Sequence, residues 1–468
     1  MAERPEFRLE LSQNKYLSTS DKVMDAVLTV TGTGGGVAAE AAEVLLVDCS
    51  SSMDWPPTKI DAARRATRAA IDTLRDGVFF GVVQGTLHAT MVYPDGPRLV
   101  PAGPETRAAA KAAVAGLIAS GQTAIGRWLA LAGQLLDRHP DAVRHAVLLT
   151  DGRNEFESEA DLAAVLASCA GRFVCDARGI GDDWDVGELE RIAVALQGSA
   201  DAVVDEAELA ADFRKMIGNA MRKVVPELRL RITTMPFTEL RFVKQVHPSV
   251  VDLTERCVQT GPRTYELTTG PWAAEDREYH LCLEVRLPGR PMGEDFQLGK
   301  VELATGDRWD EAGPVPVVGH VTEDVVLFSR PDPRVERHTV QQDLGHAVRA
   351  GWDAFEQQDR AAAAAEWGTA VRLATGLGNE EILRRLRRLV DVEDAAAGRV
   401  RLRDDLRRRD LFSAVLGSNL SGFGSGQDKV VPELAVGAEC VCVVCAWVSP
   451  PGSMVCVSCG ERFPAEGS

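Results

Sequence analysis

A short apolar run that ends in an acid and several hydroxyls constrains the fold of this chain most strongly. Residues Val44–Val47 are apolar, Asp48, Ser50 and Ser52 follow at once, and a helical pattern extends over Lys59–Leu74. Such a run is typical of a buried strand in a parallel sheet. Because ligands of open parallel α/β sheets bind beyond the carboxyl ends of the strands, these side chains are expected at a binding site. Their hard oxygens favour Mg²⁺ as the ligand.

Two further loops carry side chains of the same kind. The segment Gly121–Gly126 opens a helical pattern and contributes the hydroxyl of Thr123. The apolar run Val147–Leu149 ends in Thr-Asp-Gly and contributes the carboxylate of Asp151. A single Asp-x-Ser-x-Ser segment is also typical of a helix cap or a turn. Three such loops together instead favour one metal site, made of Asp48, Ser50, Ser52, Thr123 and Asp151.

The three motifs resemble the metal-ion-dependent adhesion site (MIDAS) of the von Willebrand factor A (vWA) domain. The resemblance extends over about residues 40–224 and includes the family's Asp-x-Ser-x-Ser, its downstream threonine and its Thr/Ser-Asp-Gly loop. It implies that Ser50 and Ser52 ligate Mg²⁺, or Mn²⁺ or Ca²⁺ in its place, directly through their hydroxyls. Thr123 is expected to ligate the ion when a partner is bound.

The same resemblance assigns the remaining side chains of the site. Asp48 and Asp151 are expected to act largely through bound water, and an Asp or Glu of a protein partner would complete the octahedron. The metal would therefore be part of the interface. Ser51 and Gln122 differ from the family pattern, because the family often has glycine at these two positions.

Residues 40–224 alternate strand and helix patterns, which is typical of a doubly wound, mostly parallel sheet of the vWA or Rossmann-like kind. The fold class predicted for this part is therefore α/β. The expected strands are Val44–Val47, Val78–Val83, Ala146–Leu149, Arg172–Cys175 and Ala202–Val204. The expected helices are Lys59–Leu74, Thr106–Ala119, Ile125–Leu136, Ala160–Cys169, Val186–Leu196 and Ala207–Arg222.

Period-two patterns before and after this segment indicate antiparallel sheet with one solvated face. Residues 1–39 show two such strands, and residues 225–333 show several more between Gly/Pro turns. Since two strands alone are marginally stable, we expect residues 1–39 to pair with residues 225–333. The result would be an antiparallel β-sandwich into which the α/β domain is inserted. This architecture resembles that of proteins related to the inter-alpha-trypsin-inhibitor heavy chains.

The C-terminal third divides into a helical part, a linker and a cysteine-rich tail. Residues 334–412 are predicted to be helical, either as a cap on the β-sandwich or as a peptide-binding array of tetratricopeptide type, and a single hairpin favours the cap. The arginine clusters of this region alternate with acids, which indicates a salt-bridged helix face rather than a nucleic-acid surface. Residues 413–436 are rich in glycine and serine and are predicted to be a flexible linker.

Residues 437–468 contain two Cys-x-x-Cys knuckles, Cys442 with Cys445 and Cys456 with Cys459. Two such turns complete a tetrahedron of thiolates around Zn²⁺, and the pattern resembles a small zinc ribbon. Cys440 is an alternative to Cys442, and a pair of free or redox dithiols is the alternative to a metal site. A module of about thirty residues can hardly fold without metal.

Length and charge restrict the function classes. A chain of 468 residues suggests about two to four domains. Its net charge of −17 disfavours general binding to nucleic acid or anionic membranes. No apolar run approaches the roughly 20 residues of a membrane span, and the charged start lacks an apolar signal core, so we expect a cytoplasmic protein. In that reducing compartment, clustered cysteines favour metal binding over disulfides.

The function predicted from these features is a metal-dependent scaffold or adaptor for protein–protein interaction, of the bacterial vWA type. We do not expect an enzyme, because no known catalytic motif accompanies the acids. One alternative is a Mg²⁺-dependent phosphohydrolase, which would need a second acid where Ser50 stands. Another is nucleic-acid association through the zinc ribbon, although Arg462 is the one basic residue after Cys440. Self-association is a further alternative, in which an exposed Glu or Asp of one copy completes the metal site of a neighbouring copy.

Overall fold

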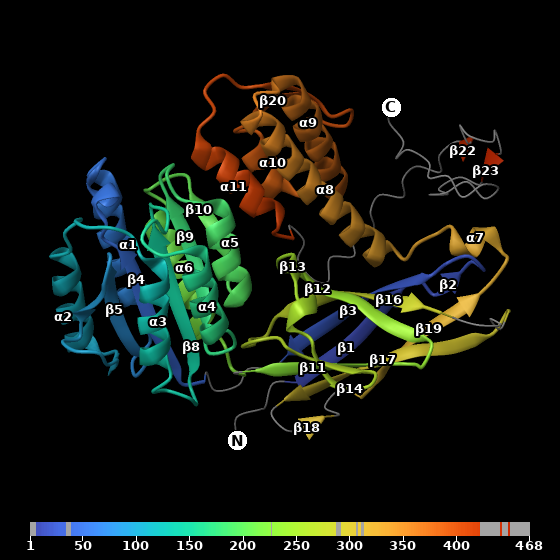
Figure 1. Cartoon of the computed structure of the whole chain (residues 1–468), viewed down its shortest axis with the longest axis horizontal. Helices are drawn as coiled ribbons and strands as arrows, with labels where there is room; N and C mark the ends of the chain where they lie inside the picture. The colour runs from blue at the N-terminus through green and yellow to red at the C-terminus, as the bar shows by residue number, and fades with distance from the viewer. Residues whose placement is uncertain are drawn as a thin grey trace.

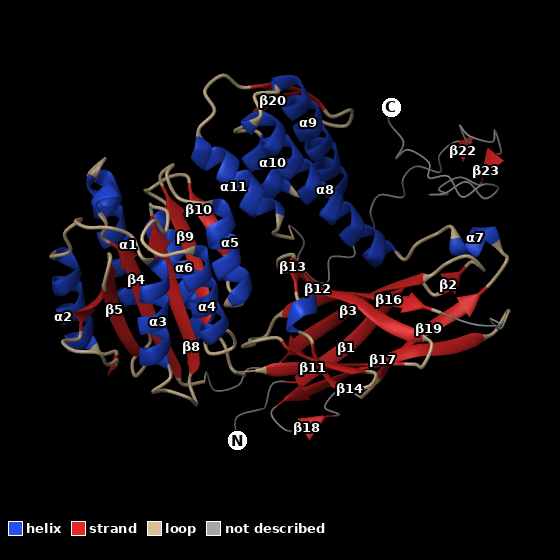
Figure 2. Cartoon of the chain, viewed as in Figure 1, coloured by secondary structure: helices blue, strands red, loops and turns tan. Residues whose placement is uncertain are grey.

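The computed structural model consists of an α/β unit, two antiparallel sheets and a helical region, which lie side by side in Figure 1. Figure 2 shows that helices cover the parallel sheet on both faces, whereas strands make up nearly all of the antiparallel part. The structure describes residues 6–33, 39–225, 227–286, 292–305, 308–309, 313–421, 440–441 and 448–449.

A seven-stranded sheet forms the α/β unit, with the order β10-β9-β8-β4-β5-β6 and with β7 pairing to β5. Strands β10 to β5 along this order are parallel, and β6 and β7 run antiparallel to β5. The prediction of an α/β fold with a mostly parallel sheet is confirmed. The strands are β4 (Ala41–Asp48), β5 (Phe79–Gly85), β6 (Ala89–Tyr93), β7 (Val100–Pro101), β8 (Val143–Thr150), β9 (Val174–Ile180) and β10 (Ala200–Val203).

Helices pack on both faces of this sheet, and strand β4 is therefore buried along its whole length. Val44 and Leu46 belong to one hydrophobic cluster with α3, α4 and α5, and Leu45 and Val47 belong to another with α1, α2 and α6. A short 3-10 helix, η1 (Ser51–Asp54), follows β4 directly. The helices are α1 (Thr58–Thr73), α2 (Pro104–Ala115), α3 (Ile125–Leu136), α4 (Glu159–Cys169), α5 (Val186–Ala195) and α6 (Leu209–Met221).

Within the described residues, the strands outside the α/β unit form two large sheets and two small two-stranded sheets. The large sheets have the orders β1-β3-β16-β12-β13 and β14-β15-β11-β17-β19-β2, with β18 pairing to β17. Apolar side chains of both sheets share one hydrophobic cluster around Trp272 and Tyr279. The elements are β1 (Glu6–Gln13), β2 (Tyr16–Leu17), β3 (Val23–Thr33), β11 (Leu228–Thr234), β12 (Thr238–His247), β13 (Val251–Asp252), η2 (Thr254–Arg256), β14 (Val258–Gly261), β15 (Thr264–Thr268), β16 (Asp276–Val285), β17 (Asp295–Thr305), β18 (Arg308–Trp309) and β19 (Val315–Val321).

The N-terminal strands pair with strands that follow the α/β unit in sequence. Strand β3 lies antiparallel to β16, with Leu28 opposite Tyr279, and the short strand β2 pairs in parallel with β19. In β11, buried residues alternate strictly with half-buried ones, which is the pattern of a strand with one face in a core. The chain therefore leaves these sheets after β3, forms the α/β unit and returns to them at β11.

The helical region differs from its prediction because it includes a β-hairpin. Arginines and acids alternate here with Val392 and Val400, and Gly398 adopts a positive φ of 66° at the turn. Arg399 and Arg401 pair with acids on the neighbouring strand, so this part of the salt-bridged surface is a hairpin face. Arg384, in contrast, pairs with Glu381 on the same helix, as expected for a salt-bridged helix face. The elements are α7 (Val325–Phe328), α8 (Pro333–Glu356), α9 (Arg360–Leu377), α10 (Glu380–Leu386), β20 (Val390–Asp394), β21 (Arg399–Leu402) and α11 (Arg408–Ser418).

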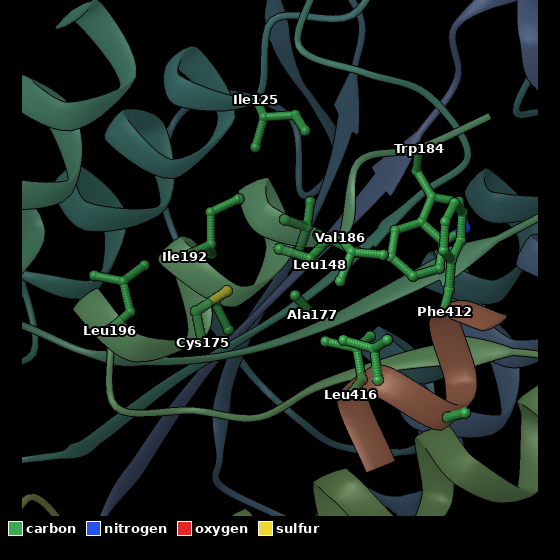
Figure 3. Close-up of a cluster of buried hydrophobic side chains, with 14 of the residues drawn as sticks. Ile125, Leu148, Cys175, Ala177, Trp184, Val186, Ile192, Leu196, Phe412 and Leu416 are labelled. Atoms are coloured by element: carbon green, nitrogen blue, oxygen red, sulfur yellow. The ribbon is translucent and has the colours of Figure 1, made fainter. Parts of the chain in front are cut away.

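Helix α11 also extends past residue 412, where the sequence predicts a linker. Its residues Val415 and Leu416 are buried, so apolar packing continues the helix through this segment. Figure 3 shows Phe412 and Leu416 of α11 directed at Trp184 and the α/β sheet. The helical region thus shares its apolar core with the α/β unit, whereas a cap on the antiparallel sheets was expected. Helix α8 contacts those sheets through polar groups, including His338 Nε2 at 2.6 Å from Glu278 Oε2.

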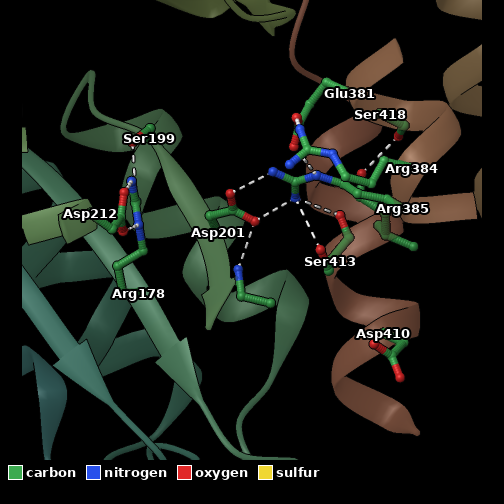
Figure 4. Close-up of polar contacts among 12 residues, drawn as sticks. Arg178, Ser199, Asp201, Asp212, Glu381, Arg384, Arg385, Asp410, Ser413 and Ser418 are labelled. Atoms are coloured by element: carbon green, nitrogen blue, oxygen red, sulfur yellow. Dashed lines mark hydrogen bonds and ion pairs between the residues drawn. The ribbon is translucent and has the colours of Figure 1, made fainter. Parts of the chain in front are cut away.

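A half-buried ion pair adds to this contact between the helical region and the α/β unit (Figure 4). Arg385 of α10 donates to Asp201 of β10 at 2.6 and 2.8 Å, and also to the carbonyl of Ser413 at 2.8 Å. Gly417 permits this approach, since a Cβ there would lie 2.5 Å from Arg385 Cδ. The Arg385 side chain therefore links α10 and α11 to the edge strand β10.

The cysteine-rich tail lies mostly outside the described residues. The structure describes only β22 (Cys440–Val441) and β23 (Val448–Ser449), which pair antiparallel. Cys442, Cys445, Cys456 and Cys459 are outside the described residues, and so is most of the linker predicted at 413–436. In the part of the chain that the structure does describe, no helix has the length and apolar character needed to cross a membrane.

Candidate metal centre

The predicted site lies at the point where the strand order of the α/β sheet reverses. Strand β4 is followed in sequence by β5 on one side, and β8 lies on its other side. Asp48 ends β4, and Asp151 directly follows β8. Ligands of open α/β sheets bind in the crevice outside such a switch point, because the loops from the two central strands diverge there.

The structure brings Asp48, Ser50, Ser52 and Asp151 together in one hydrogen-bonded group. The hydroxyl oxygens of Ser50 and Ser52 are 2.8 Å apart, and Ser52 Oγ donates to Asp151 Oδ1 at 2.6 Å. Asp48 accepts from the backbone N–H of Ser50 at 2.7 Å and from the hydroxyl of Thr150 at 2.6 Å. Asp48 therefore fixes the loop after β4, while Asp151 orients Ser52.

Thr123 reaches the same group from the loop before α3. A Cβ on Gly152 would lie 3.2 Å from Thr123 Oγ1 and 3.5 Å from Ser52 Oγ, so the glycine borders the space between the two hydroxyls. Among the described residues, the Thr123 hydroxyl makes no hydrogen bond. All five predicted residues thus lie around one small space, with one hydroxyl left available.

Hydrogen bonds donated by backbone N–H groups connect the three loops. Ser51 N donates to Gly121 O at 2.9 Å and Gly121 N donates to Ser51 Oγ at 3.0 Å, so the serine that departs from the family pattern joins the first two loops. Phe156 N donates to Thr123 O at 3.4 Å. Glu157 of the third loop accepts from Gly126 N at 2.7 Å at the start of α3. The loops are therefore positioned before any ligand binds.

The charge of the centre is concentrated in two buried carboxylates. Asp48 and Asp151 are both fully buried. Burial, together with the nearby charge of Asp151, raises the pKa of Asp48 to about 6, and the hydrogen bonds from Thr150 and Ser50 only partly oppose this. A buried carboxylate is stabilised by a cation, so this pair of acids favours the binding of positive charge.

One charged residue at the centre was not among the residues predicted from the sequence. Lys59, on the first turn of α1, lies 2.8 Å through its Nζ from Asp151 Oδ2 and 3.4 Å from the carbonyl oxygen of Ser52. The lysine and the aspartate are 92 positions apart in sequence. A lysine at a helix start is ordinarily solvated, and nothing in the local sequence distinguishes this one.

The donor set suits a hard divalent cation. Octahedral Mg²⁺ with ligands at about 2.0–2.1 Å places neighbouring oxygens about 2.9 Å apart, which is close to the 2.8 Å between the Ser50 and Ser52 hydroxyls. The described residues contain no group of three or more His, Cys, Asp or Glu that could hold a metal. Hydroxyls and water would therefore supply most of the ligands at this centre. Mg²⁺ accepts such oxygen ligands, whereas Zn²⁺ favours thiolates and imidazoles.

Comparison with known proteins identifies two segments of the chain. The model of the von Willebrand factor type A domain matches residues 42–202, which contain the whole candidate centre. The model of the von Willebrand factor type A C-terminal domain matches residues 372–412, which run from α9 into α11. Both matched segments contribute to one apolar core in the structure.

Solved structures and one curated relative extend this comparison. A von Willebrand factor type A protein from Catenulispora acidiphila is 41% identical, with a TM-score of 0.83 over 90% of this chain and 98% of its own. The ArnB paralog VWA2 from Sulfolobus acidocaldarius, 12% identical with a TM-score of 0.54 over 90% of this chain and 99% of its own, shares the fold. An uncharacterized protein from Synechocystis sp. is 28% identical over 58% of this chain, a match that spans 64% of that protein's length. With 41% identity over nearly the full length of a relative, and with the matching domain model, the chain belongs to the von Willebrand factor type A family.

Proposed function

We propose that this protein is an adaptor that binds a carboxylate of a protein partner through Mg²⁺ held at a MIDAS. The observation that carries the proposal is the convergence of three hydroxyls and two buried carboxylates at the sheet's switch point. Domains of the vWA family commonly mediate protein–protein interaction, which fits this role. Mn²⁺ or Ca²⁺ could take the place of Mg²⁺ in a site of oxygen donors.

Each side chain would have a distinct task in this mechanism. Ser50, Ser52 and Thr123 would hold the ion through their hydroxyls, and Asp48 and Asp151 would balance its charge. The bound ion would supply the positive position that a partner's Asp or Glu completes. Thr123 is suited to respond to that partner, because its hydroxyl has no hydrogen bond to the described residues that would first have to break.

Exposed apolar side chains on the same three loops favour a partner of particular composition. Trp55 follows η1 and is 80% exposed, Ile118 precedes the Thr123 loop and is 69% exposed, and Phe156 lies in the loop after β8 and is 43% exposed. Large apolar residues beside a polar site are typical of interaction surfaces. We infer that the partner's acid is flanked by bulky apolar residues.

The remaining parts of the chain would serve presentation and assembly. We propose that the two antiparallel sheets act as an accessory β-sandwich that carries the α/β unit. Cys442, Cys445, Cys456 and Cys459 would bind Zn²⁺ in a ribbon that docks a second protein. The proposed adaptor acts in the cytoplasm and is not an enzyme. The phosphohydrolase alternative is weaker because Ser50, whose hydroxyl lies 2.8 Å from that of Ser52, stands where a second acid would be needed.

A pull-down with the wild type and with Ser50→Ala/Ser52→Ala, both in Mg²⁺, tests the proposal. We expect the variant to lose the partners that the wild type captures, because two direct ligands are gone. Ser18→Ala/Ser20→Ala is the matched control, since these serines have the same spacing and are 2.9 Å apart on the exposed surface of the antiparallel part. A partner set that is unchanged in the Ser50/Ser52 variant would refute the metal-dependent mechanism.

Replacing Trp55 with alanine should weaken the binding of such a partner by about tenfold or more, since buried tryptophans often dominate interface energies. Mg²⁺ binding, followed by titration calorimetry, should not change, because Trp55 supplies no ligand. Val258→Ala is the control, as Val258 is 63% exposed on β14 of the antiparallel part. Equal affinities of the Trp55 variant and the wild type would exclude Trp55 from the interface.

A further inference from the structure

The ammonium group of Lys59 occupies a position built by three separate elements. It comes from α1, pairs with Asp151 after β8 at 2.8 Å, and lies 3.4 Å from the carbonyl of Ser52 after β4. Its side chain is only 6% exposed. Lysine is almost never buried to this degree unless it is paired, so the carboxylate of Asp151 accounts for its placement.

Two features argue that this arrangement is specific to the site. Lys59 lies in the first turn of α1, where the helix dipole disfavours a positive charge, so the acids of the centre must outweigh that effect. Gly181, at the end of β9 with a φ of 81°, leaves room for the side chain, since a Cβ there would lie 2.9 Å from Lys59 Cε. The lysine is therefore fitted into a slot and is not a solvated surface group.

The charges at the centre depend on this residue. Asp48 and Asp151 together carry two negative charges when ionised, and Lys59 cancels one of them. A divalent cation would therefore leave the loaded site with one positive charge, which a single partner carboxylate neutralises. If Lys59 were neutral, the loaded site would already be balanced, and a carboxylate would add an uncompensated negative charge.

We propose that Lys59 is a resident cation that weakens metal binding on its own and makes the metal-loaded site select a carboxylate. This inference rests on the proposed function and concerns the regulation of the same site. Without the divalent ion, Lys59 holds Asp151 and the loop after β8. With the ion, its charge couples the binding of the metal to the binding of the partner's acid.

Titration calorimetry of Mg²⁺ with the full chain tests the inference, using wild type and Lys59→Met. A unit charge near a divalent ion in a partly buried site has a strong effect, so the dissociation constant for Mg²⁺ should fall by about tenfold or more in the variant. Sodium acetate, compared with sodium chloride at equal ionic strength, is the carboxylate probe. Acetate should tighten Mg²⁺ binding to the wild type and have a smaller effect on the variant.

A second neutral variant and a matched control complete the experiment. Lys59→Gln keeps a hydrogen bond to Asp151 within reach, so it serves if the methionine variant fails to fold, and the same fall is expected. Lys111→Met removes a lysine whose partner, Asp72, lies about 20 Å along α1 from Lys59, and it should bind Mg²⁺ as the wild type does. Equal Mg²⁺ affinities in the wild type and both Lys59 variants would overturn the inference and leave the proposed function standing. No Mg²⁺ binding by any of them would overturn the proposed function itself.

Discussion

Replacing His145 with leucine is expected to lower the free energy of unfolding by about 3–5 kcal/mol, because the change breaks a buried charge network. His145 lies on β8 and is 4% exposed. Its Nδ1 is 2.8 Å from a carboxylate oxygen of Glu43, and its Nε2 is 3.1 Å from Asp176 Oδ2. Without the imidazole, the buried Glu43 and the half-buried Asp176 lose their shared cation. Urea unfolding at neutral pH measures the effect.

The double variant Glu43→Leu/His145→Leu is the control for this prediction. Replacing both members of a buried ion pair by apolar residues is often close to neutral, so the double variant should be more stable than the single one. A single variant that loses less than about 1 kcal/mol would show that the network contributes little. Asp176 remains supported in both variants, since Ser199 donates to it through its backbone N–H and its hydroxyl, each at 2.7 Å.

The same network makes stability depend on pH. Burial alone would lower the pKa of His145, but the charge of Glu43 and the hydrogen bonds to both acids outweigh burial and raise this pKa to about 10. The contribution of the protonated imidazole is therefore complete below the unfolded value of about 6.5 and is lost as the pH rises toward 10. The wild type should lose stability over this interval, and the part of that loss due to His145 should be missing in His145→Leu.

Much of the α/β unit is predictable because its buried strands are continuous apolar runs. The pattern over Ile125–Leu136 predicts a helix with the same bounds as α3. Strand β6, in contrast, is half exposed along its length, and a run such as Ala89–Tyr93 carries no clear pattern. It forms because β5 offers it an edge, and this is a long-range interaction that the local sequence does not contain.

Some residues of the candidate centre are likewise predictable from the sequence and others are not. Asp48, Thr123 and Asp151 are predictable, since each follows a strand or opens a helix and the topology of parallel sheets then brings the loops together. Lys59 is not, because its partner lies 92 positions away and the slot beside Gly181 exists only in the folded chain. The pair of Arg385 with Asp201 spans 184 positions and was missed for the same reason.

Replacing Phe412 with alanine is expected to destabilise the protein by about 3–5 kcal/mol. Phe412 is 1% exposed on α11, and its ring lies against that of Trp184 (Figure 3), with 4.7 Å between the ring centroids. Its centroid lies 5.9 Å from that of Trp352. The ring therefore fills the contact between the helical region and the α/β unit. Its loss leaves a cavity lined by two indoles that belong to different parts of the chain.

Urea unfolding followed by tryptophan fluorescence measures this effect, because Trp184 and Trp352 face the altered position. Phe156→Ala is the matched control: the same substitution at a 43% exposed position should change stability by no more than about 0.5 kcal/mol. Similar unfolding midpoints for the two variants would mean that the helical region contributes little to the stability of the α/β unit. A loss confined to Phe412→Ala would instead mean that α11 is an integral part of the fold that carries the metal centre.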